Sequence, residues 1–338
     1  MKDDLSLDLA IADTPDTIAR CLVADNAVRA ASVQLGQVWQ HIRGARALPA
    51  VVETLLGELC AAAPLLAATL KFDGTLVIQL QGDAASPVRL MVVEYSPQHT
   101  LRAAVKLNDE YEIKQAGLQH LGLQQLISAA GSGRFIVVLD PTQKMPGQTA
   151  YTSLVPIVGD SVATSIDYYM SSSEQLPTRI MLAANSTHCA GMLLQRLPNE
   201  GGIKAVAIAP ALNEHGHEIS ATDAHDDTWL RMRHLLNTVK PQELLATSSV
   251  TMLRRLFWQE NPTAASSQTL RFVCPCSRQK VGKMLKMLGA VEVESIIAER
   301  GDVEVLCDYC EQQYLFDAVD CAALLRADGG LSASGAVH

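Results

Sequence analysis

Aromatic residues are scarce in this chain, and positive charge is nowhere concentrated. Only 4% of the 338 residues are Phe, Trp or Tyr, whereas 48% are hydrophobic, so a core must be built mainly from Leu, Val, Ile and Ala. The formal net charge is -9, and no block of Lys and Arg occurs. Surfaces for nucleic acid or anionic membranes need concentrated positive charge, so we expect no nucleic-acid partner.

Long apolar runs and targeting signals are missing as well. No run of about eighteen apolar residues occurs, which predicts no transmembrane helix and no membrane partner. The residues after Met1 lack the basic and apolar segments of a secretory signal. We therefore expect a cytoplasmic protein with reduced thiols. The length allows more than one domain.

No motif joins a nucleophile to a base, and none binds a nucleotide. The phosphate loop G-x-x-x-x-G-K-[ST], the esterase motif G-x-S-x-G and the metalloprotease motif H-E-x-x-H do not occur. Gly131-Ser132-Gly133 is predicted to be a turn. Glu214-His215-Gly216-His217-Glu218 and the nearby His225-Asp226-Asp227 favour a solvated polar loop over a metal site. We expect no enzyme and no nucleotide ligand.

Cysteine is the informative residue type. Four of the 8 cysteines form two tight pairs thirty residues apart, Cys274-Pro275-Cys276 and Cys307-Asp308-Tyr309-Cys310. Two such pairs suit one tetrahedral zinc ion per chain, and in a cytoplasmic protein they favour metal over disulfides. The other four stand alone among apolar residues and are predicted to be small buried side chains: Cys21, Cys60, Cys189 and Cys321.

Residues 272–320 are predicted to form a small zinc-binding domain, with helices at 277–288 and 292–300 and a strand at 303–306. A unit this short buries little apolar surface and usually needs an additional cross-link to be stable, which a bound metal ion can supply. It holds nine acidic against five basic residues, which argues against a zinc-dependent nucleic-acid binder. Spacing alone favours a structural zinc site over a switching one, because structural zinc is far commoner.

The fold class predicted for residues 1–198 is α+β, a core domain of antiparallel sheets with helices. The first thirteen residues are expected to be a loose tail. Residues 75–107 are expected to form an antiparallel meander. The predicted helices lie at 13–24, 37–43, 49–70, 120–129 and 161–172. The predicted strands lie at 27–35, 75–81, 88–95, 100–107, 135–139, 151–158, 178–183 and 190–197.

Residues 199–271 are predicted to be a flexible, helical linker. Its first part, to about residue 226, is polar, and helices follow near 227–239 and 249–259, the first capped by Asp227. A polar lead, 261–268, then reaches the cysteines. Apolar side chains share one face of each helix: Trp229, Met232, Leu236 and Val239 in the first, and Val250, Leu253, Leu256 and Phe257 in the second. Residues 321–338 are expected to be a disordered tail.

Several motifs, in order along the chain, resemble the heat-shock protein 33 family of redox-regulated chaperones. The two cysteine pairs with their spacer resemble that family's signature, and Tyr314-Leu315-Phe316 follows them as it does there. Further segments resemble family motifs in the core: residues 70–74, 79–83, 173–178 and 191–195. The resemblance covers residues 14–320, and the stretch between Gln195 and Trp229 is longer than the family's pattern.

The resemblance implies a holdase for unfolding client proteins that needs no ATP and is a homodimer when active. It implies that the reduced protein is inactive and binds zinc through Cys274, Cys276, Cys307 and Cys310. It implies that stress oxidation forms the disulfides Cys274–Cys276 and Cys307–Cys310, and that zinc then leaves. The linker would unfold and offer its apolar side chains to clients: Trp229, Met232, Leu253, Leu256 and Phe257.

Two alternatives stay open on the residues alone. One is an enzyme with a purely structural zinc module, which would need a catalytic constellation in residues 14–198. The other is a scaffold whose zinc never leaves. The scaffold differs from the switch in behaviour only, so a redox experiment separates the two.

Overall fold

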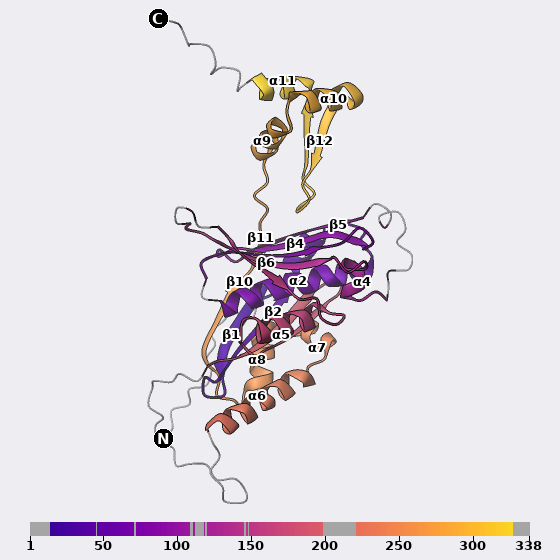
Figure 1. Ribbon diagram of the computed structural model, residues 1–338. Helices are drawn as coiled ribbons and strands as arrows, with labels where there is room; N and C mark the ends of the chain where they lie inside the picture. Colours follow the sequence, from indigo (N-terminus) through magenta and orange to yellow (C-terminus); the bar gives the residue numbers. More distant parts are fainter. Residues whose placement is uncertain are drawn as a thin grey trace, which may run out of the picture. The chain divides into compact units, whose positions relative to one another are not determined.

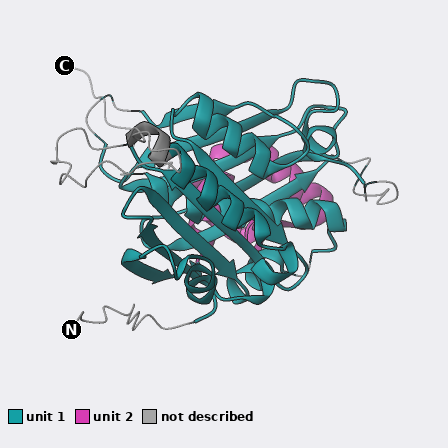
Figure 2. Cartoon of the chain, turned by 90° about the horizontal axis from the view of Figure 1, so that it is seen from below, with its two compact units in different colours: residues 1–272 teal, residues 273–338 magenta. Residues whose placement is uncertain are grey.

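The chain divides into two compact units, residues 1–272 (unit 1) and 273–338 (unit 2), coloured separately in Figure 2. The structure is a computed structural model that describes residues 14–198, apart from 45, 71, 109–110, 112–117, 119, 145–146 and 148, and residues 221–326. The predicted N-terminal tail and the polar segment with Glu214, His215, His217 and Glu218 therefore lie outside the described residues.

Unit 1 contains two sheets, each with a sequence-distant strand at one edge. The first sheet is antiparallel, in the order β10-β1-β2-β9-β8. Its strands are β1 (Thr17–Val23), β2 (Val28–Leu35), β8 (Thr178–Ala184), β9 (Cys189–Arg196) and β10 (Thr263–Thr269). The second sheet has the order β11-β5-β4-β3-β6-β7. Its strands are β3 (Gly74–Gln81), β4 (Val88–Tyr95), β5 (Thr100–Leu107), β6 (Arg134–Pro141), β7 (Tyr151–Val155) and β11 (Arg271–Phe272). The antiparallel neighbours β3, β4 and β5 confirm the predicted meander.

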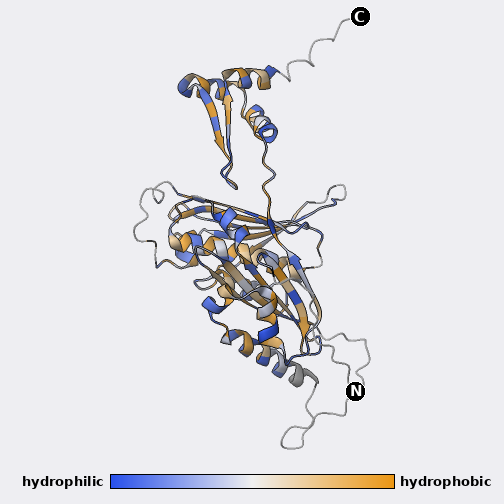
Figure 3. Ribbon diagram, turned by 180° about the vertical axis from the view of Figure 1, so that it is seen from behind, coloured by the Kyte–Doolittle hydropathy of each residue, from blue (hydrophilic) through white to orange (hydrophobic). Residues whose placement is uncertain are grey.

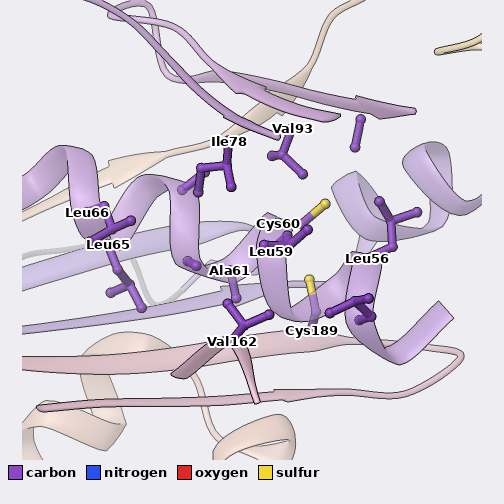
Figure 4. Close-up of a cluster of buried hydrophobic side chains, with 14 of the residues drawn as sticks. Leu56, Leu59, Cys60, Ala61, Leu65, Leu66, Ile78, Val93, Val162 and Cys189 are labelled. Carbon is purple, nitrogen blue, oxygen red and sulfur yellow. The ribbon is translucent and has the colours of Figure 1, made fainter. Parts of the chain in front are cut away.

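Helix α2 (Ala50–Thr69) lies between the two sheets and forms the centre of the main core (Figure 1). Leu59 and Cys60 of this helix lie among Ile78 and Val93 of the second sheet and Cys189 of the first (Figure 4). By length and composition α2 could cross a membrane, but 72% of its most apolar stretch is buried inside the unit. Its sequence is therefore that of a core helix with apolar surface on both sides.

Three shorter helices complete this layer: α1 (Gln37–Arg43), α4 (Leu123–Ile127) and α5 (Val162–Ser172). Buried Asp16 caps the start of α1, where its Oδ1 accepts the N–H groups of Gly36 at 2.8 Å and Val38 at 2.9 Å. These N–H groups have no partner within the helix, so the carboxylate fixes where α1 begins. The helix predicted over 120–129 is shorter in the structure.

Helices α6 (Ala221–Thr238), α7 (Pro241–Ala246) and α8 (Ser249–Phe257) cover the other face of the first sheet (Figure 1). Ser248 caps α8 by accepting the N–H of Thr251 at 3.3 Å. Polar and apolar residues alternate along the three helices (Figure 3), as expected for helices with one buried side. They build a second apolar cluster with the sheet.

Three predictions for unit 1 are wrong or incomplete. Residues 13–24 were predicted to be helical, but residues 17–23 form β1, because Ile18 faces the main core while Ala19 and Cys21 face the second cluster. A helix can bury one stripe, whereas a strand between two layers buries both faces. The polar lead 261–268 contains strand β10, which pairs with β1. Asp227 does not cap α6, because this helix already begins at Ala221 and Asp227 lies inside it.

Unit 2 is small and has few fully buried side chains. It consists of α9 (Arg278–Leu288), α10 (Ala290–Arg300), the hairpin β12 (Asp302–Leu306) and β13 (Gln313–Asp317), and α11 (Ala318–Arg326). Its core contains five buried side chains: Leu285, Val293, Val303, Phe316 and Cys321. Helix α11 extends past residue 321, where the disordered tail was predicted to begin, because Cys321 packs into this core. Residues 327–338 lie outside the described residues.

Candidate metal centre

The two cysteine pairs meet in unit 2. One ligand atom from each of Cys274, Cys276, Cys307 and Cys310 lies within 4.8 Å of the others, and no further cluster of this kind occurs among the described residues. The Sγ atoms of Cys274 and Cys307 are 3.6 Å apart, and those of Cys276 and Cys310 are 3.3 Å apart. The four thiols therefore lie together in the structure, as the two-pair spacing predicted.

Local backbone structure places each pair. Cys274 and Cys276 lie in the segment before α9, whose first turn is capped by Ser277. Cys307 follows β12 and starts a tight turn, in which its carbonyl accepts the N–H of Glu311 at 2.9 Å. The hairpin register Leu306↔Gln313 closes that turn, so Cys310 is returned toward Cys307. All four cysteines are partly exposed.

This donor set fits a divalent metal ion. A tetrahedral zinc ion with Zn–S bonds of about 2.3 Å requires sulfur atoms about 3.8 Å apart, close to the separations present here. Four neighbouring thiolates repel one another strongly unless a cation lies between them. Sulfur ligands favour zinc over magnesium or calcium. The four residues can therefore hold a metal ion.

Tyr314, on β13, completes the surroundings of the sulfur atoms. Its hydroxyl donates to Cys276 Sγ at 3.1 Å. Burial raises the pKa of the Cys276 thiol, but this hydrogen bond and those of the other thiols outweigh burial and lower the pKa to about 7. Burial raises the pKa of Cys310 to about 12. The hydrogen bond to Cys276 raises the pKa of Tyr314 itself to about 12.

No role was predicted for Tyr314 from the sequence. The run Tyr314-Leu315-Phe316 entered only as part of the family resemblance. The available signal was the position of a hydroxyl four residues after Cys310 in a strand that pairs with the one leading to Cys307. Outer hydrogen bonds of this kind orient ligands and tune the metal.

The other four cysteines are buried, which confirms their prediction as small core side chains. Burial raises the pKa of Cys21 to about 12 and raises the pKa values of Cys60 and Cys189 as well. Thiols held in the neutral form are poor nucleophiles and poor metal ligands. The four thiols of the unit 2 cluster are partly exposed, so they are more accessible to oxidants than the four buried ones.

The side chains predicted to contact clients belong to unit 1. Trp229, Met232, Leu253 and Phe257 are buried against the outer face of the first sheet, and Leu256 is half-buried beside them. Their neighbours on the sheet include Ala19, Cys21, Val28, Ala190 and Met192. In this conformation the apolar sides of the helices and the outer face of the first sheet cover each other, so neither is exposed to solvent.

The remaining sequence candidates show ordinary structural roles where they are described. Ser132, in the predicted Gly131-Ser132-Gly133 turn, donates its N–H to Asp83 Oδ2 at 3.3 Å, so the turn closes on a carboxylate instead of a phosphate. Asp226, from the His225-Asp226-Asp227 run, pairs with Arg196 at 2.5 Å.

Comparisons with known proteins agree with this arrangement. The family described as "Hsp33 protein" matches residues 16–317. A 33 kDa chaperonin of Chromobacterium violaceum is 36% identical over 323 residues, covering 96% of this chain and 98% of the relative. One from Methylobacillus flagellatus is 35% identical, covering 93% and 95%. The crystal structure of a 33 kDa chaperonin (heat shock protein 33 homolog) from Thermotoga maritima has a similar fold, with a TM-score of 0.70 at 20% identity, covering 93% of this chain and 99% of that one.

Proposed function

Because the chain belongs to the Hsp33 family of chaperones, we propose that it is a redox-regulated holdase that needs no ATP. In this proposal the reduced protein holds one zinc ion through Cys274, Cys276, Cys307 and Cys310 and is inactive. Oxidation of the four thiols then activates it. The observation that carries the proposal is the convergence of four sulfur atoms within 4.8 Å in a unit with a very small core.

The four sulfur atoms would act as the redox sensor. Bound zinc would keep them as thiolates and add about 10 kcal/mol or more of folding free energy to unit 2. Peroxide oxidises one thiolate of a pair to a sulfenic acid and leaves a hydroxide ion, and the second thiolate attacks that sulfur to form a disulfide and release a second hydroxide ion. Each pair thereby gives two electrons to one peroxide and gives up two thiolate ligands.

We propose the pairing Cys274–Cys276 and Cys307–Cys310. The shortest distances in the structure join sulfurs across the pairs, at 3.6 Å and 3.3 Å, so crossed disulfides are the competing outcome. Proteolytic peptides of the oxidised chain, separated without reduction, distinguish the two. Crossed bonds would link residues near 275 to residues near 308 in one disulfide-joined peptide.

The output of the switch would be the apolar cluster between α6–α8 and the first sheet. We propose that residues 199–271 act as a linker, which unfolds when unit 2 loses its metal and its fold. Trp229, Met232, Leu253, Leu256 and Phe257 would then become accessible, together with the sheet face that they cover. Their burial in the present conformation supports this proposal, because an inactive holdase has to keep its client surface covered.

The proposal includes unfolding proteins as clients, a homodimer in the active state and a cytoplasmic location. It includes no catalytic, nucleotide, nucleic-acid or membrane role. The relatives' name, 33 kDa chaperonin, agrees with a protein that is not an enzyme.

The decisive experiment follows zinc release and client protection in one tube. Peroxide is added at mildly raised temperature with a colour-forming chelator and an aggregation-prone client. We expect about one zinc ion per chain to leave as aggregation becomes suppressed. If zinc stays bound, or leaves while the client still aggregates, the result would favour the alternatives, a scaffold or an enzyme with a purely structural zinc module.

Two variants sharpen this experiment. Replacing Cys307 and Cys310 with Ser should remove the normal response to peroxide. Cys321→Ala is the matched control, because Cys321 lies in unit 2 but outside the sulfur cluster. Limited proteolysis should cut residues 200–270 faster after oxidation of the unmodified chain, and equal rates would contradict the linker part of the proposal.

A further inference from the structure

Unit 1 contains a cavity of about 280 Å³ between its two sheets, beside the C-terminal end of α2. The first sheet contributes Ile18 and Arg20 of β1, and the second contributes Leu76 and Tyr95. A neighbouring cavity of about 330 Å³ shares Arg20 with the first and is also lined by Arg29. The Arg20 side chain therefore borders both cavities.

Some hydrogen-bond donors at these cavities have no partner among the described residues. Arg20 Nε donates to Ser266 Oγ at 2.9 Å, and its two Nη groups have no partner among the described residues. Arg29 Nη1 donates only to neutral oxygens, the carbonyl of Thr69 at 3.0 Å and Gln195 Oε1 at 2.9 Å. The Nε2 of Gln195, whose Oε1 accepts from Arg29, is buried without an acceptor among the described residues. Arg20 is exposed, so its Nη groups are open to an acceptor that enters the cavity from solvent.

Positive charge also accumulates here. Burial lowers the pKa of His99, which lines the first cavity, and the charges of Arg20 and Arg271 lower it further. Burial and the charge of Arg20 likewise lower the pKa of Arg29. The single carboxylate lining the first cavity, within the described residues, is Asp73, and its Oδ1 accepts the hydroxyl of Thr142 at 3.4 Å. Among the described residues, neither Arg20 nor Arg29 forms an ion pair with Asp73 or another carboxylate.

We propose that the first cavity, of about 280 Å³, binds a small organic oxyanion, a phosphate or carboxylate carried on an apolar body. The oxyanion would bind the free Nη groups of Arg20, because a guanidinium presents paired donors that match such anions. It would lie beside the ring of His99, whose Nδ1 is hydrogen-bonded to the Tyr95 hydroxyl at 2.6 Å. The apolar body would contact Ile18, Phe72 and Leu76. The volume is near the lower end of that of ligand pockets, about 300 Å³, which suits one aromatic ring with its anionic group.

The bound anion would also hold β10 in place. Ser266, the partner of Arg20, and Gln268, which lines the cavity, are both on this edge strand. A ligand that contacts Arg20 and Gln268 together would join β10 to β1 and to the second sheet. Amides of residues 263–269 should then exchange more slowly with solvent deuterium.

To test this proposal, the full chain is titrated separately with phenyl phosphate, benzoate, benzyl alcohol and inorganic phosphate. Calorimetry or NMR measures the affinity for each compound. We expect one or both aromatic anions to bind at least tenfold more tightly than benzyl alcohol, and more tightly than inorganic phosphate. The aromatic anion that binds better identifies the group. Equal binding of alcohol and anions would overturn the anion site, and equal binding of inorganic phosphate would overturn the apolar part.

Variants locate the binding. Arg20→Gln should weaken it at least tenfold, and His99→Asn should weaken it as well. Asn suits position 99 because its φ is +57, in the left-handed region that Asn tolerates. Arg134→Gln, an exposed arginine on β6, is the control and should leave affinity unchanged. Anion binding that survives both cavity variants would place the ligand elsewhere and overturn the assignment, and unchanged exchange at 263–269 would overturn the proposed role of β10.

Discussion

At the scale of single residues, the hydroxyl of Tyr314 is the feature that best tests the metal centre. It donates to Cys276 Sγ at 3.1 Å, and removing it takes a hydrogen bond from a candidate ligand atom without changing the four candidate ligands. Outer contacts of this kind are worth about 10- to 100-fold in metal affinity. Tyr314→Phe should therefore weaken zinc binding about tenfold.

Competition with a chromogenic chelator under reducing conditions measures this change. Tyr151→Phe is a suitable control, because Tyr151 is 60% exposed and lies in unit 1. Unchanged zinc affinity in the Tyr314 variant would mean that its hydroxyl does not support the ligand in the metal-bound state.

Glu58, on the central helix, gives a pH prediction. Burial raises its pKa from 4.5 to about 7. The folded state therefore binds this proton more tightly than the unfolded state, and the free energy of unfolding falls as pH rises from about 4.5 to 7. A shift of this size corresponds to at most about 3 kcal/mol lost above neutral pH.

Glu58→Gln removes the titration and should be more stable than the parent at pH 8, by up to about 3 kcal/mol, and equally stable near pH 4. Urea unfolding at both pH values measures the difference, with the exposed Glu243→Gln on α7 as control. A stability difference that does not vary with pH would show that Glu58 is not the titrating group.

Sequence reasoning succeeded for residues whose chemistry is rare and failed for those whose role depends on distant partners. The four paired cysteines could be identified as a cluster because two close pairs have few other uses in a reduced compartment. The roles of Tyr314 and Asp16 could not be predicted, because the role of a tyrosine or an aspartate depends on which residues the fold places beside it. Asp16 caps a helix twenty residues further along the chain.

At the scale of secondary structure, elements that carry their own pattern were predicted well. Helix α2 is a long, mostly apolar segment, and strands β3 to β5 are short apolar-rich runs. Clear turn residues lie at their ends, and the structure confirms all four elements. Strand β10 could not be predicted, since its sequence, Thr-Ala-Ala-Ser-Ser-Gln-Thr, is polar and small. It forms because β1 offers an unpaired edge, which is information held in residues 17–23.

Close packing of α2 on the first sheet leads to a prediction about Gly57. A Cβ atom there would lie 2.5 Å from Cβ of Ala184 and 3.2 Å from Cβ of Cys189. Alanine favours helices over glycine by about 1 kcal/mol, but overpacking a core costs about 1–3 kcal/mol. Gly57→Ala should therefore destabilise unit 1.

Gly282→Ala in α9 is the matched comparison. Its new Cβ would meet only the end of the flexible Leu324 side chain, at 3.0 Å, so the helix propensity should dominate and unit 2 should be unchanged or more stable. Thermal unfolding of both variants measures the contrast. Equal effects at the two positions would show that helix propensity, and not contact with the sheet, decides the outcome.

At the scale of the whole molecule, the two units differ in what stabilises them. Unit 1 has two sheets around a buried helix and a second cluster under α6–α8, whereas unit 2 has five buried side chains and a two-stranded hairpin. A hairpin of this size is marginal in water without further support. We infer that the stability of unit 2 depends on the metal and that of unit 1 does not.

Removal of the metal under reducing conditions tests this inference without any oxidation. A strong chelator should abolish hydrogen-exchange protection in α9, α10 and the β12–β13 hairpin, because metal binding and folding are coupled in small metal-dependent units. Amides of α2 and of β2 to β4 should keep their protection, since no candidate metal cluster among the described residues lies in their core. Protection that persists in residues 278–317 after the metal has gone would mean that five buried side chains suffice to fold unit 2. Loss of zinc could then not act as a conformational signal, and any redox response would have to come from the disulfides alone.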